Sequence, residues 1–339
     1  MANRAAIEAL DALLRDLCKN NTLFRGKLIV FGGDFRQVLP IVRGGTRDQQ
    51  INASLITSDF WNDITKLKLD CNRRAREDPE FIEFLIRIGN GTEPTNTLGQ
   101  VQLPLPMVIP YTTHAESLEG LISYVYEDLS LFASKPFEMM NRVILAPLND
   151  FGDDINSMLI DRMEGEYLDY LNSLEPRGLP QHRLVLKTNC PVVLLRNINP
   201  VEGLCNVTRL ICKTLKQNVV VAVIANGQFV GKHVWIPRIP LEPNPGDNKY
   251  LIPFVRRQIP LRLCFAMTIN KAQGQTLDYV GIYLKQPVFS HGQLYVALSR
   301  ARNGASVKVL ILPPTYSDLA TRHTANVVYA EVLALSGAT

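Results

Sequence analysis

The apolar positions near the start of the chain predict one helix and two strands. The apolar run at 28–31 leads into two glycines and predicts a buried strand, and the alternating stretch "KLKLD" at 66–70 predicts a half-buried strand. A helix is predicted before both, because apolar residues recur on one face at steps of three and four residues. These apolar residues are Ile7, Leu10, Leu14 and Leu17.

A second helix is predicted within 78–91, with a clear signal at each end. Asp78 can cap its start, Pro79 suits its first position, and Gly91 suits its end. Residues 92–110 are rich in Pro, Thr and Gly and predict a long loop between two lobes. The buried stripe of the helix is predicted to be Phe81, Phe84, Leu85 and Ile88.

The rest of the chain predicts a second α/β lobe that is interrupted by a β-rich insertion. Between about 206 and 262, short apolar stretches such as "NVVVAVI" and "KHVWIP" alternate with turns, which predicts a small β insertion. On both sides of the insertion the pattern is typical of alternating strands and helices. The strands are predicted at 142–147, 191–197, 262–268, 279–284 and 306–312, and the helices near 153–163 and at 290–301.

Composition narrows the class of protein without identifying it. The 339 residues are 46% hydrophobic and 20% charged, which is ordinary globular composition and enough for two domains. The net charge of +4 is too small to indicate a polyanion partner by itself. No apolar run approaches the roughly 18 residues of a membrane span, so no membrane partner is expected. The six cysteines are far apart, which is typical of reduced thiols in an intracellular protein and predicts no metal site.

The sequence contains no complete phosphate-binding loop of the form Gly-x4-Gly-Lys-Ser/Thr, whose backbone N–H groups would hold phosphate oxygens. The nearest match, "GQFVGKH" from Gly227, is one residue short and carries His233 where the hydroxyl belongs. It also lies inside the predicted β insertion, outside any strand-to-helix context. A hairpin turn is therefore the favoured interpretation of this stretch.

Two polar stretches in the first part of the chain are candidates for chemistry. "GGDFRQVLP" at 32–40 presents Asp34 and Gln37 directly after a predicted strand, which is where a nucleotide-hydrolysing enzyme would place a magnesium ligand. The plain alternative is a polar turn after a core strand. "CNRRA" at 71–75 offers a guanidinium that could bind a phosphate with two hydrogen bonds, or it faces solvent.

Two further polar stretches lie in the second part of the chain. "AMTINKAQGQTL" at 266–277 combines a dense set of hydrogen-bonding side chains with a glycine, which suits a ligand-binding loop or a simple surface loop. "HGQLYVALSRAR" at 291–302 places Arg300 near the end of a predicted helix. An arginine there serves catalysis, or it only interacts favourably with the helix dipole.

In order and spacing, these four stretches resemble the third to sixth motifs of the PIF-type (petite integration frequency) ATP-dependent DNA helicases of superfamily one. The resemblance covers nearly the whole chain and is closest to the branch associated with Helitron transposons. It implies an α/β fold of two RecA-like parallel-sheet lobes, at 1–110 and 111–339. The first lobe would be incomplete, and the second would carry a small β-barrel insertion at about 206–262.

The same resemblance implies an activity and partners. These are 5′ to 3′ unwinding coupled to ATP hydrolysis, with ATP and Mg²⁺ as cofactors and single-stranded DNA or DNA junctions as partners. The implied processes are DNA repair, recombination, telomere maintenance or transposition, in the nucleus.

The resemblance also implies roles for individual residues. Gln37 would contact the terminal phosphate, and Arg74 and Arg300 would stabilise charge on the transferring phosphoryl group. Gly274 and Gln275 would contact the nucleotide. The residues that would contact single-stranded DNA are Thr268, Asn270, Lys271, Gln273 and Thr276. Among these, Asn270 stands where many relatives carry His.

The first two motifs of the family, the phosphate loop and an Asp-Glu pair that holds Mg²⁺, have no counterpart in the sequence. The chain is therefore expected to begin after them, with an unpaired strand edge and apolar surface exposed in the first lobe. Two hypotheses follow: an ATP-dependent DNA helicase, or an inactive remnant that at most binds single-stranded DNA. A small-molecule α/β enzyme is a third hypothesis, with no cofactor motif to support it.

Overall fold

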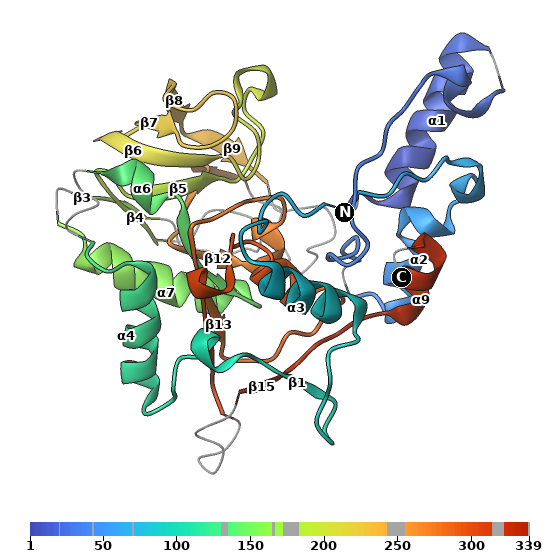
Figure 1. The fold of residues 1–339 in the computed structure, drawn as a ribbon. Helices are drawn as coiled ribbons and strands as arrows, with labels where there is room; N and C mark the ends of the chain where they lie inside the picture. The colour runs from blue at the N-terminus through green and yellow to red at the C-terminus, as the bar shows by residue number, and fades with distance from the viewer. Residues whose placement is uncertain are drawn as a thin grey trace.

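The computed structural model shows an α/β protein with two larger sheets, one parallel and one antiparallel (Figure 1). The prediction of an α/β fold is confirmed at this level. The structure describes residues 1–19, 21–42, 44–69, 71–129, 135–164, 167–171, 183–242, 255–313 and 322–337. Among these residues, no helix is both long enough and apolar enough to span a lipid bilayer.

The parallel sheet has four strands in the order β12-β2-β13-β14, and all of its ladders are parallel. Successive residues of a strand point to opposite faces, so Ile144 and Val143 of β2 enter two different hydrophobic cores. Helices α4 and α7 cover one face, and α8 with α3 covers the other. The bounds are β12 Ala266–Thr268, β2 Arg142–Ala146, β13 Tyr279–Leu284, β14 Val307–Ile311, α3 Pro79–Asn90, α4 His114–Val125, α7 Asn149–Arg162 and α8 Gln293–Leu298.

The antiparallel sheet has five strands in the order β11-β5-β6-β7-β8. It shares one continuous hydrophobic core with α4, α7 and one face of the parallel sheet. Its described strands have an open order, so the closed barrel stays a prediction. β5 also belongs to this sheet, although it precedes the predicted insertion of 206–262. The bounds are β5 Pro191–Leu194, β6 Arg209–Lys216, β7 Val219–Ile224, β8 His233–Pro237 and β11 Leu261–Leu263.

Shorter elements complete the described fold. Three two-stranded antiparallel sheets are present among the described residues. β3 pairs with β4, β9 pairs with β10, and β1 pairs with β15. Their bounds are β1 Gln100–Gln102, β3 Tyr167–Leu171, β4 Arg183–Lys187, β9 Ile239–Leu241, β10 Arg256–Gln258 and β15 His323–Ala325. The remaining α-helices are α1 Arg4–Cys18, α2 Arg47–Asn52, α6 Pro136–Met139 and α9 Ala330–Ser336. The 3₁₀ turns are Leu23–Gly26, Leu55–Thr57, Trp61–Asp63, Leu105–Met107, Pro200–Glu202, Ile269–Ala272 and Gly304–Ser306.

Both strands predicted near the start of the chain are wrong. Residues 28–31 and 66–69 have no regular secondary structure, and no described strand pairs with them. A strand is stable only when a neighbour satisfies its backbone and covers one face, and neither condition holds here. The apolar side chains are therefore exposed, at 93% for Leu28, 84% for Val30, 88% for Leu67 and 98% for Leu69. The exposed apolar surface expected of the first lobe is present.

The helix predictions in the first part of the chain are confirmed. α1 forms over the predicted apolar repeat, although Leu10 and Leu17 on that face stay exposed. α3 begins as expected, because the Asp78 side chain accepts from the backbone N–H of Phe81 and Pro79 is the first residue. It ends at Gly91, which has a left-handed backbone, and its whole predicted stripe is buried.

Two predictions in the second part need correction, and one helix was missed. The strand predicted at 262–268 is two strands, β11 and β12, which belong to different sheets. The helix predicted at 290–301 is shorter and forms only α8. The helix α4 was not predicted at all, although its first turn is capped by the side chain of Thr113.

The C-terminal residues pack against the first part of the chain. We call residues 322–337 the C-terminal strap. β15 of the strap pairs with β1. α9, in red, contacts the 3₁₀ turn Leu55–Thr57 and is joined to the blue α2 by the Arg47–Glu331 ion pair (Figure 1). The strap residues Tyr329 and Val332 share a small core with Leu39, Ile51 and Ile56. The first part of the chain, which has no parallel sheet among its described residues, is thus packed against the strap.

We predict opposite outcomes for two matched Leu→Ala substitutions. Leu69→Ala should change the free energy of unfolding by less than about 0.5 kcal/mol, because this side chain is almost fully exposed. Leu85→Ala should cost about 2–5 kcal/mol, because it opens a cavity under α3. Denaturant unfolding of the two variants measures both values. A loss above about 1 kcal/mol at Leu69 would show that 66–69 is a buried strand after all.

Candidate functional site

The loop at 34–38 is an internally bonded turn. The backbone N–H of Gln37 donates to the Asp34 carbonyl at 3.0 Å, and the Gln37 side chain donates to the Asp34 carboxylate at 3.3 Å. The Asp34 carboxylate also accepts from the backbone N–H of Arg36 at 3.1 Å. An aspartate that bonds its own following backbone is typical of a turn. The structure therefore supports the interpretation of this stretch as a polar turn. The Asp34 carboxylate accepts hydrogen bonds from within the turn, from Arg36 and Gln37.

The same loop is hydrogen-bonded to α3, in the first part of the chain, and to the segment that follows β12, in the second part. Arg36 Nε donates to Asn90 Oδ1 of α3 at 2.6 Å. On the other side, Gln273 Nε2 donates to Gln37 Oε1 at 2.9 Å, across 236 residues of sequence. Gln37 therefore lies where two segments predicted to bind a ligand meet.

Arg74 bridges the same two parts of the chain. Its Nε donates to Thr276 Oγ1 at 2.9 Å, and its Nη1 donates to the Ser299 carbonyl at 2.6 Å. Burial lowers the pKa of this guanidinium below its ordinary value. The solvent-facing alternative for "CNRRA" is wrong for this arginine, which spans the gap between the two parts.

Arg300 is buried beside Arg74, with 1% of its surface exposed. Its Nε donates to the Val296 carbonyl at 2.8 Å, Nη1 to the Gln275 carbonyl at 3.1 Å, and Nη2 to Ser299 Oγ at 2.7 Å. Burial, and then the positive charge of Arg74, lower the pKa of Arg300 to about 10. Within the described residues, neither arginine forms an ion pair with a carboxylate.

We call this group of seven side chains the polar cluster. It joins predicted site residues from all four motifs with one residue, Ser299, that was not predicted. Gly274 lies within the same segment and is exposed, with a left-handed backbone and no atom near its Cβ position, so its backbone is open to a ligand. The members are Gln37, Arg74, Gln273, Gln275, Thr276, Ser299 and Arg300.

The other predicted DNA-binding residues are not members of the polar cluster, although the Lys271 carbonyl accepts from Gln275 Nε2 at 3.2 Å. Thr268 is buried at the end of β12, and Asn270 accepts a hydrogen bond from Gln293 at 3.4 Å. Lys271 Nζ donates to Asn149 Oδ1 at 3.1 Å, at the carboxyl edge of the parallel sheet. Burial, and then the charge of Arg262, lower the pKa of Lys271 to about 8. Ligands of parallel α/β sheets bind at this edge, which keeps Lys271 a candidate.

His291 is a site residue that the sequence did not reveal. It is fully buried, and its Nδ1 accepts from the backbone N–H of Tyr329 at 2.9 Å, so Nε2 carries the proton and donates to the Phe35 carbonyl at 2.7 Å. Its ring stacks on Tyr329. His291 thus joins the loop of Gln37 to the C-terminal strap. The only hint in the sequence was its position at the start of the sixth-motif stretch. Its hydrogen-bond partners, Phe35 and Tyr329, lie in segments that are remote in sequence.

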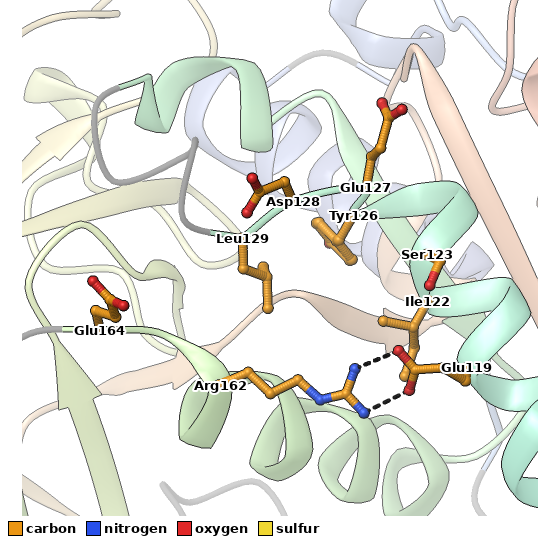
Figure 2. A pocket seen from close by; sticks show the side chains of 9 residues that line it. All are labelled: Glu119, Ile122, Ser123, Tyr126, Glu127, Asp128, Leu129, Arg162 and Glu164. Atoms are coloured by element: carbon orange, nitrogen blue, oxygen red, sulfur yellow. Dashed lines mark hydrogen bonds and ion pairs between the residues drawn. The ribbon is translucent and has the colours of Figure 1, made fainter.

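A separate pocket of about 260 Å³ lies between α4 and the end of α7 (Figure 2). Arg162 spans it with two bonds to Glu119, of 2.9 and 2.7 Å. Because four carboxylates line it against this one guanidinium, its charge disfavours a nucleotide. It contains none of the predicted site residues. The lining residues are Glu119, Ile122, Ser123, Tyr126, Glu127, Asp128, Leu129, Arg162 and Glu164.

The polar cluster can hold an anion but offers no ligand set for a metal. Its two guanidinium groups are donors without a carboxylate partner, which suits phosphate oxygens. In the described part of the chain, no three His, Cys, Asp or Glu side chains are grouped to hold a metal ion. The fold and this site define an α/β protein in which two arginines without a carboxylate partner among the described residues lie where its first part meets its second.

Comparison with known proteins shows a similarity to one family of helicases. Residues 1–98 match the PIF1-like helicase family, and residues 169–215 match the 2B domain of the DNA helicase Pif1. These two segments are thus similar to PIF1-like helicases, and the second is similar to their 2B domain. The second match begins before residue 206, in agreement with the place of β5 in the antiparallel sheet.

Individual relatives show the same similarity. The human ATP-dependent DNA helicase PIF1 is 26% identical over 329 residues, which cover 93% of this chain and 45% of that protein. The chain thus spans about half the length of this relative. The Pif1 helicase of Candida albicans has the same fold, with a TM-score of 0.65 at 19% identity, over 100% of this chain and 74% of that one. Bacteroides Pif1 in complex with ADP-AlF3 and single-stranded DNA gives 0.60 at 20% identity, over 96% and 75%.

We predict that Gly292→Ala is more damaging than Gly274→Ala. Both glycines have a left-handed backbone, so both changes should cost about 1–2 kcal/mol. A Cβ at Gly292 would also lie 2.3 Å from the Arg36 carbonyl oxygen, whereas nothing lies near a Cβ at Gly274. The additional cost at Gly292 should be about 1–3 kcal/mol in denaturant unfolding. Equal losses would contradict the direct packing of the 34–38 loop on the start of α8.

We also predict that His291 makes stability depend on pH below 6.5. Burial lowers its pKa in the folded protein below the ordinary value of 6.5, although the Phe35 carbonyl, Glu331 and Asp34 act in the opposite direction. The unfolded chain therefore binds a proton more readily, and stability should fall as pH decreases below 6.5, by at most about 1.4 kcal/mol per pH unit.

The control for this pH dependence is His291→Gln, which removes the titrating group. Thermal or denaturant unfolding between pH 5 and 8 measures the effect in both proteins. The difference between them should shrink as pH falls. A parallel shift of the two curves would show that His291 does not titrate in this range.

Proposed function

We propose that this chain is part of an ATP-dependent DNA helicase in which the polar cluster binds the terminal phosphates of ATP. The observation that carries the proposal is the meeting of Arg74 and Arg300 at Ser299, both without a carboxylate partner. Two such guanidinium groups stabilise the charge that develops on a phosphoryl group during transfer. Relatives named as ATP-dependent DNA helicases support this substrate.

Gln37 is proposed to couple the nucleotide to DNA. It is bonded to Gln273, and the adjoining Gly274 and Thr276 expose the loop that would contact both ligands. A nucleotide phosphate drawn to the arginines would compete with the Thr276 hydroxyl and the Gln275 carbonyl for the guanidinium N–H donors, and so shift this loop. The proposal also includes two RecA-like lobes at 1–110 and 111–339, Mg²⁺ as a cofactor, 5′ to 3′ movement, a nuclear location and the Helitron branch. Mg²⁺ has no assigned ligand among the described residues.

A second candidate function is binding of single-stranded DNA without catalysis. The observation that favours it is the absence of a phosphate-loop sequence from the 339 residues. Without a lysine and nested N–H groups, the β- and γ-phosphates lack their main contacts. Arg74 and Arg300 alone would then bind an anion without promoting hydrolysis.

The test is DNA-stimulated ATP hydrolysis by this chain and by a form extended upstream of Met1. In the active form, Arg300→Ala or Arg74→Ala should lower kcat by roughly 10³- to 10⁵-fold, because each removes charge from the transition state. Arg300→Lys should not restore activity, since a lysine cannot make the three bonds of the guanidinium.

The matched control is Arg302→Ala. This arginine is two residues away, but it is exposed and paired with Asp278 at 3.2 Å, so kcat should stay within about twofold. If the extended form hydrolyses no ATP in the presence of DNA, the enzymatic proposal is wrong. The binding function then remains the candidate.

A further inference from the structure

Both ring nitrogens of His291 are bonded, one to the C-terminal strap and one to the loop of Gln37. Nδ1 accepts from the backbone N–H of Tyr329 at 2.9 Å, and Nε2 donates to the Phe35 carbonyl at 2.7 Å. The ring is fully buried, and its centroid lies 5.1 Å from that of the Tyr329 ring at an interplanar angle of 25°. Because a buried imidazole needs a partner for each nitrogen, these two bonds fix its orientation.

The next residue, Gly292, meets the same two segments. Its backbone N–H donates to the Val327 carbonyl of the strap at 3.0 Å. On its other side it lies so close to the loop that a Cβ would clash with the Arg36 carbonyl oxygen. Residues 291 and 292 therefore fix two successive residues of the loop, Phe35 and Arg36, relative to the strap.

The strap is itself held where it meets His291. Tyr329 lies in the small hydrophobic core that the strap shares with the first part of the chain. The Arg47 guanidinium lies 4.8 Å from the centroid of the Tyr329 ring and bonds the Glu331 carboxylate at 2.5 Å. A cation over an aromatic face is attracted to it. Tyr329 therefore gives His291 a fixed partner.

The turn passes this restraint on to Gln37. Phe35 and Arg36 are the central residues of the turn, which is closed by the bond from the Gln37 N–H to the Asp34 carbonyl at 3.0 Å. In a closed turn the central dihedrals are set, so fixing the Phe35 carbonyl also fixes the backbone of Gln37. From the other side, Gln273 donates to the Gln37 side chain. Gln37 is thus restrained at its backbone through His291 and at its side chain by Gln273.

We propose that His291 is a positioning residue for ATP hydrolysis, which holds Gln37 at the polar cluster by joining its loop to the C-terminal strap. The inference rests on the proposed function, in which Gln37 couples the nucleotide to DNA. A group that acts in a transition state must be in place beforehand, because a misplacement of about 1 Å can cost roughly 10²-fold in rate. Gln37 lies on a loop outside any helix or strand, so other segments must supply this restraint.

The plain alternative is that His291 only stabilises the fold. The bonding pattern favours positioning, because both bonds end on backbone groups, those of Phe35 and Tyr329, and so fix two segments relative to each other. An apolar side chain would fill the same space without fixing them.

The experiment uses the form extended upstream of Met1 and two substitutions that each keep one bond. In His291→Gln the amide nitrogen can donate to the Phe35 carbonyl, as Nε2 does, and in His291→Asn the amide oxygen can accept from Tyr329, as Nδ1 does. His291→Asn releases the loop and should lower kcat roughly 10- to 100-fold, with KM for ATP changed less than about twofold. His291→Gln should keep kcat within about threefold of the parent, since the bond to the loop remains.

A double-mutant cycle tests whether His291 acts through Gln37. In a Gln37→Ala background, His291→Asn should have no further effect on kcat, because the residue that it positions is gone. The matched control is Ile236→Ala, which opens a cavity in the remote β8 and should lower Tm while leaving kcat within about twofold. All rates are measured at a temperature at which thermal unfolding shows every variant to be folded.

Trp61 gives a second measurement that needs no ATP. Its ring packs edge-on against Phe35, with centroids 5.5 Å apart, and its Nε1 donates to the Leu335 carbonyl of the strap at 3.2 Å. The chain has two tryptophans, so Trp235→Phe leaves Trp61 as the single reporter. In this background His291→Asn should shift the emission to longer wavelength, as Trp61 becomes more exposed to water, and His291→Gln should not.

A second pair of variants tests the strap end, and it replaces the first pair if His291→Asn fails to fold. Tyr329→Leu removes the ring that stacks on His291, whereas Tyr329→Phe keeps it. Tyr329→Leu should lower kcat about tenfold, and Tyr329→Phe should keep it within about twofold. Equal kcat values in the two would contradict a role for the strap in placing His291.

The outcomes separate this inference from the proposed function. If the extended form hydrolyses ATP and Arg300→Ala abolishes this, but His291→Asn retains the parent kcat, the inference is wrong and the helicase proposal stands. An unchanged Trp61 emission, an equal loss with and without Gln37, or an equal loss in Ile236→Ala would make His291 merely structural and overturn the inference. If the extended form hydrolyses no ATP with DNA, the proposed function fails and the role of His291 in hydrolysis falls with it.

Discussion

The burial of the Arg300 guanidinium is the constraint on which the polar cluster depends. A guanidinium carries five N–H donors, and each buried donor without an acceptor costs about 1–3 kcal/mol. One acceptor is the carbonyl of Val296, which is free only because α8 ends at Leu298. A helix that continued to residue 301 would direct the backbone N–H of Arg300 to that carbonyl. The short helix is therefore a consequence of seating the side chain.

The same burial fixes the loop that precedes β13. The Gln275 carbonyl accepts from Arg300, and Thr276 accepts from Arg74, so the loop is held on both sides by cations. Neither bond neutralises charge, because carbonyl and hydroxyl oxygens carry only partial charges. Burial is the main cause of the lowered pKa of Arg300, and the positive charge of Arg74 adds to it, so a bound anion would relieve part of this cost. Strong hydrogen bonding and poor charge compensation together make the cluster suited to phosphate.

Local signals predicted the elements that depend on local interactions. α3 was predicted with its cap, its end and its buried stripe, because each of these is determined by residues within one or two turns. The strands at 28–31 and 66–70 were not correctly predicted, because an apolar run becomes a strand only when a partner strand is present. For the site, Gln37, Arg74 and Arg300 were found through a motif resemblance. Ser299 and His291 were missed, since their roles follow from contacts with remote segments.

The C-terminal strap explains how a first part without a parallel sheet remains in place. Val332 and Tyr329 supply apolar surface that Leu39 and Ile51 would otherwise lack, and the Asn326 side chain donates to the Ile88 carbonyl of α3. The 34–38 loop lies between this strap and the second part of the chain. Any motion that separates the two parts must break the Gln37–Gln273 and His291–Phe35 bonds, together with the bonds that Arg74 donates to Thr276 and Ser299. The position of Gln37 therefore depends on the strap as well as on the loop that follows β12. A structural change in either segment can move this side chain.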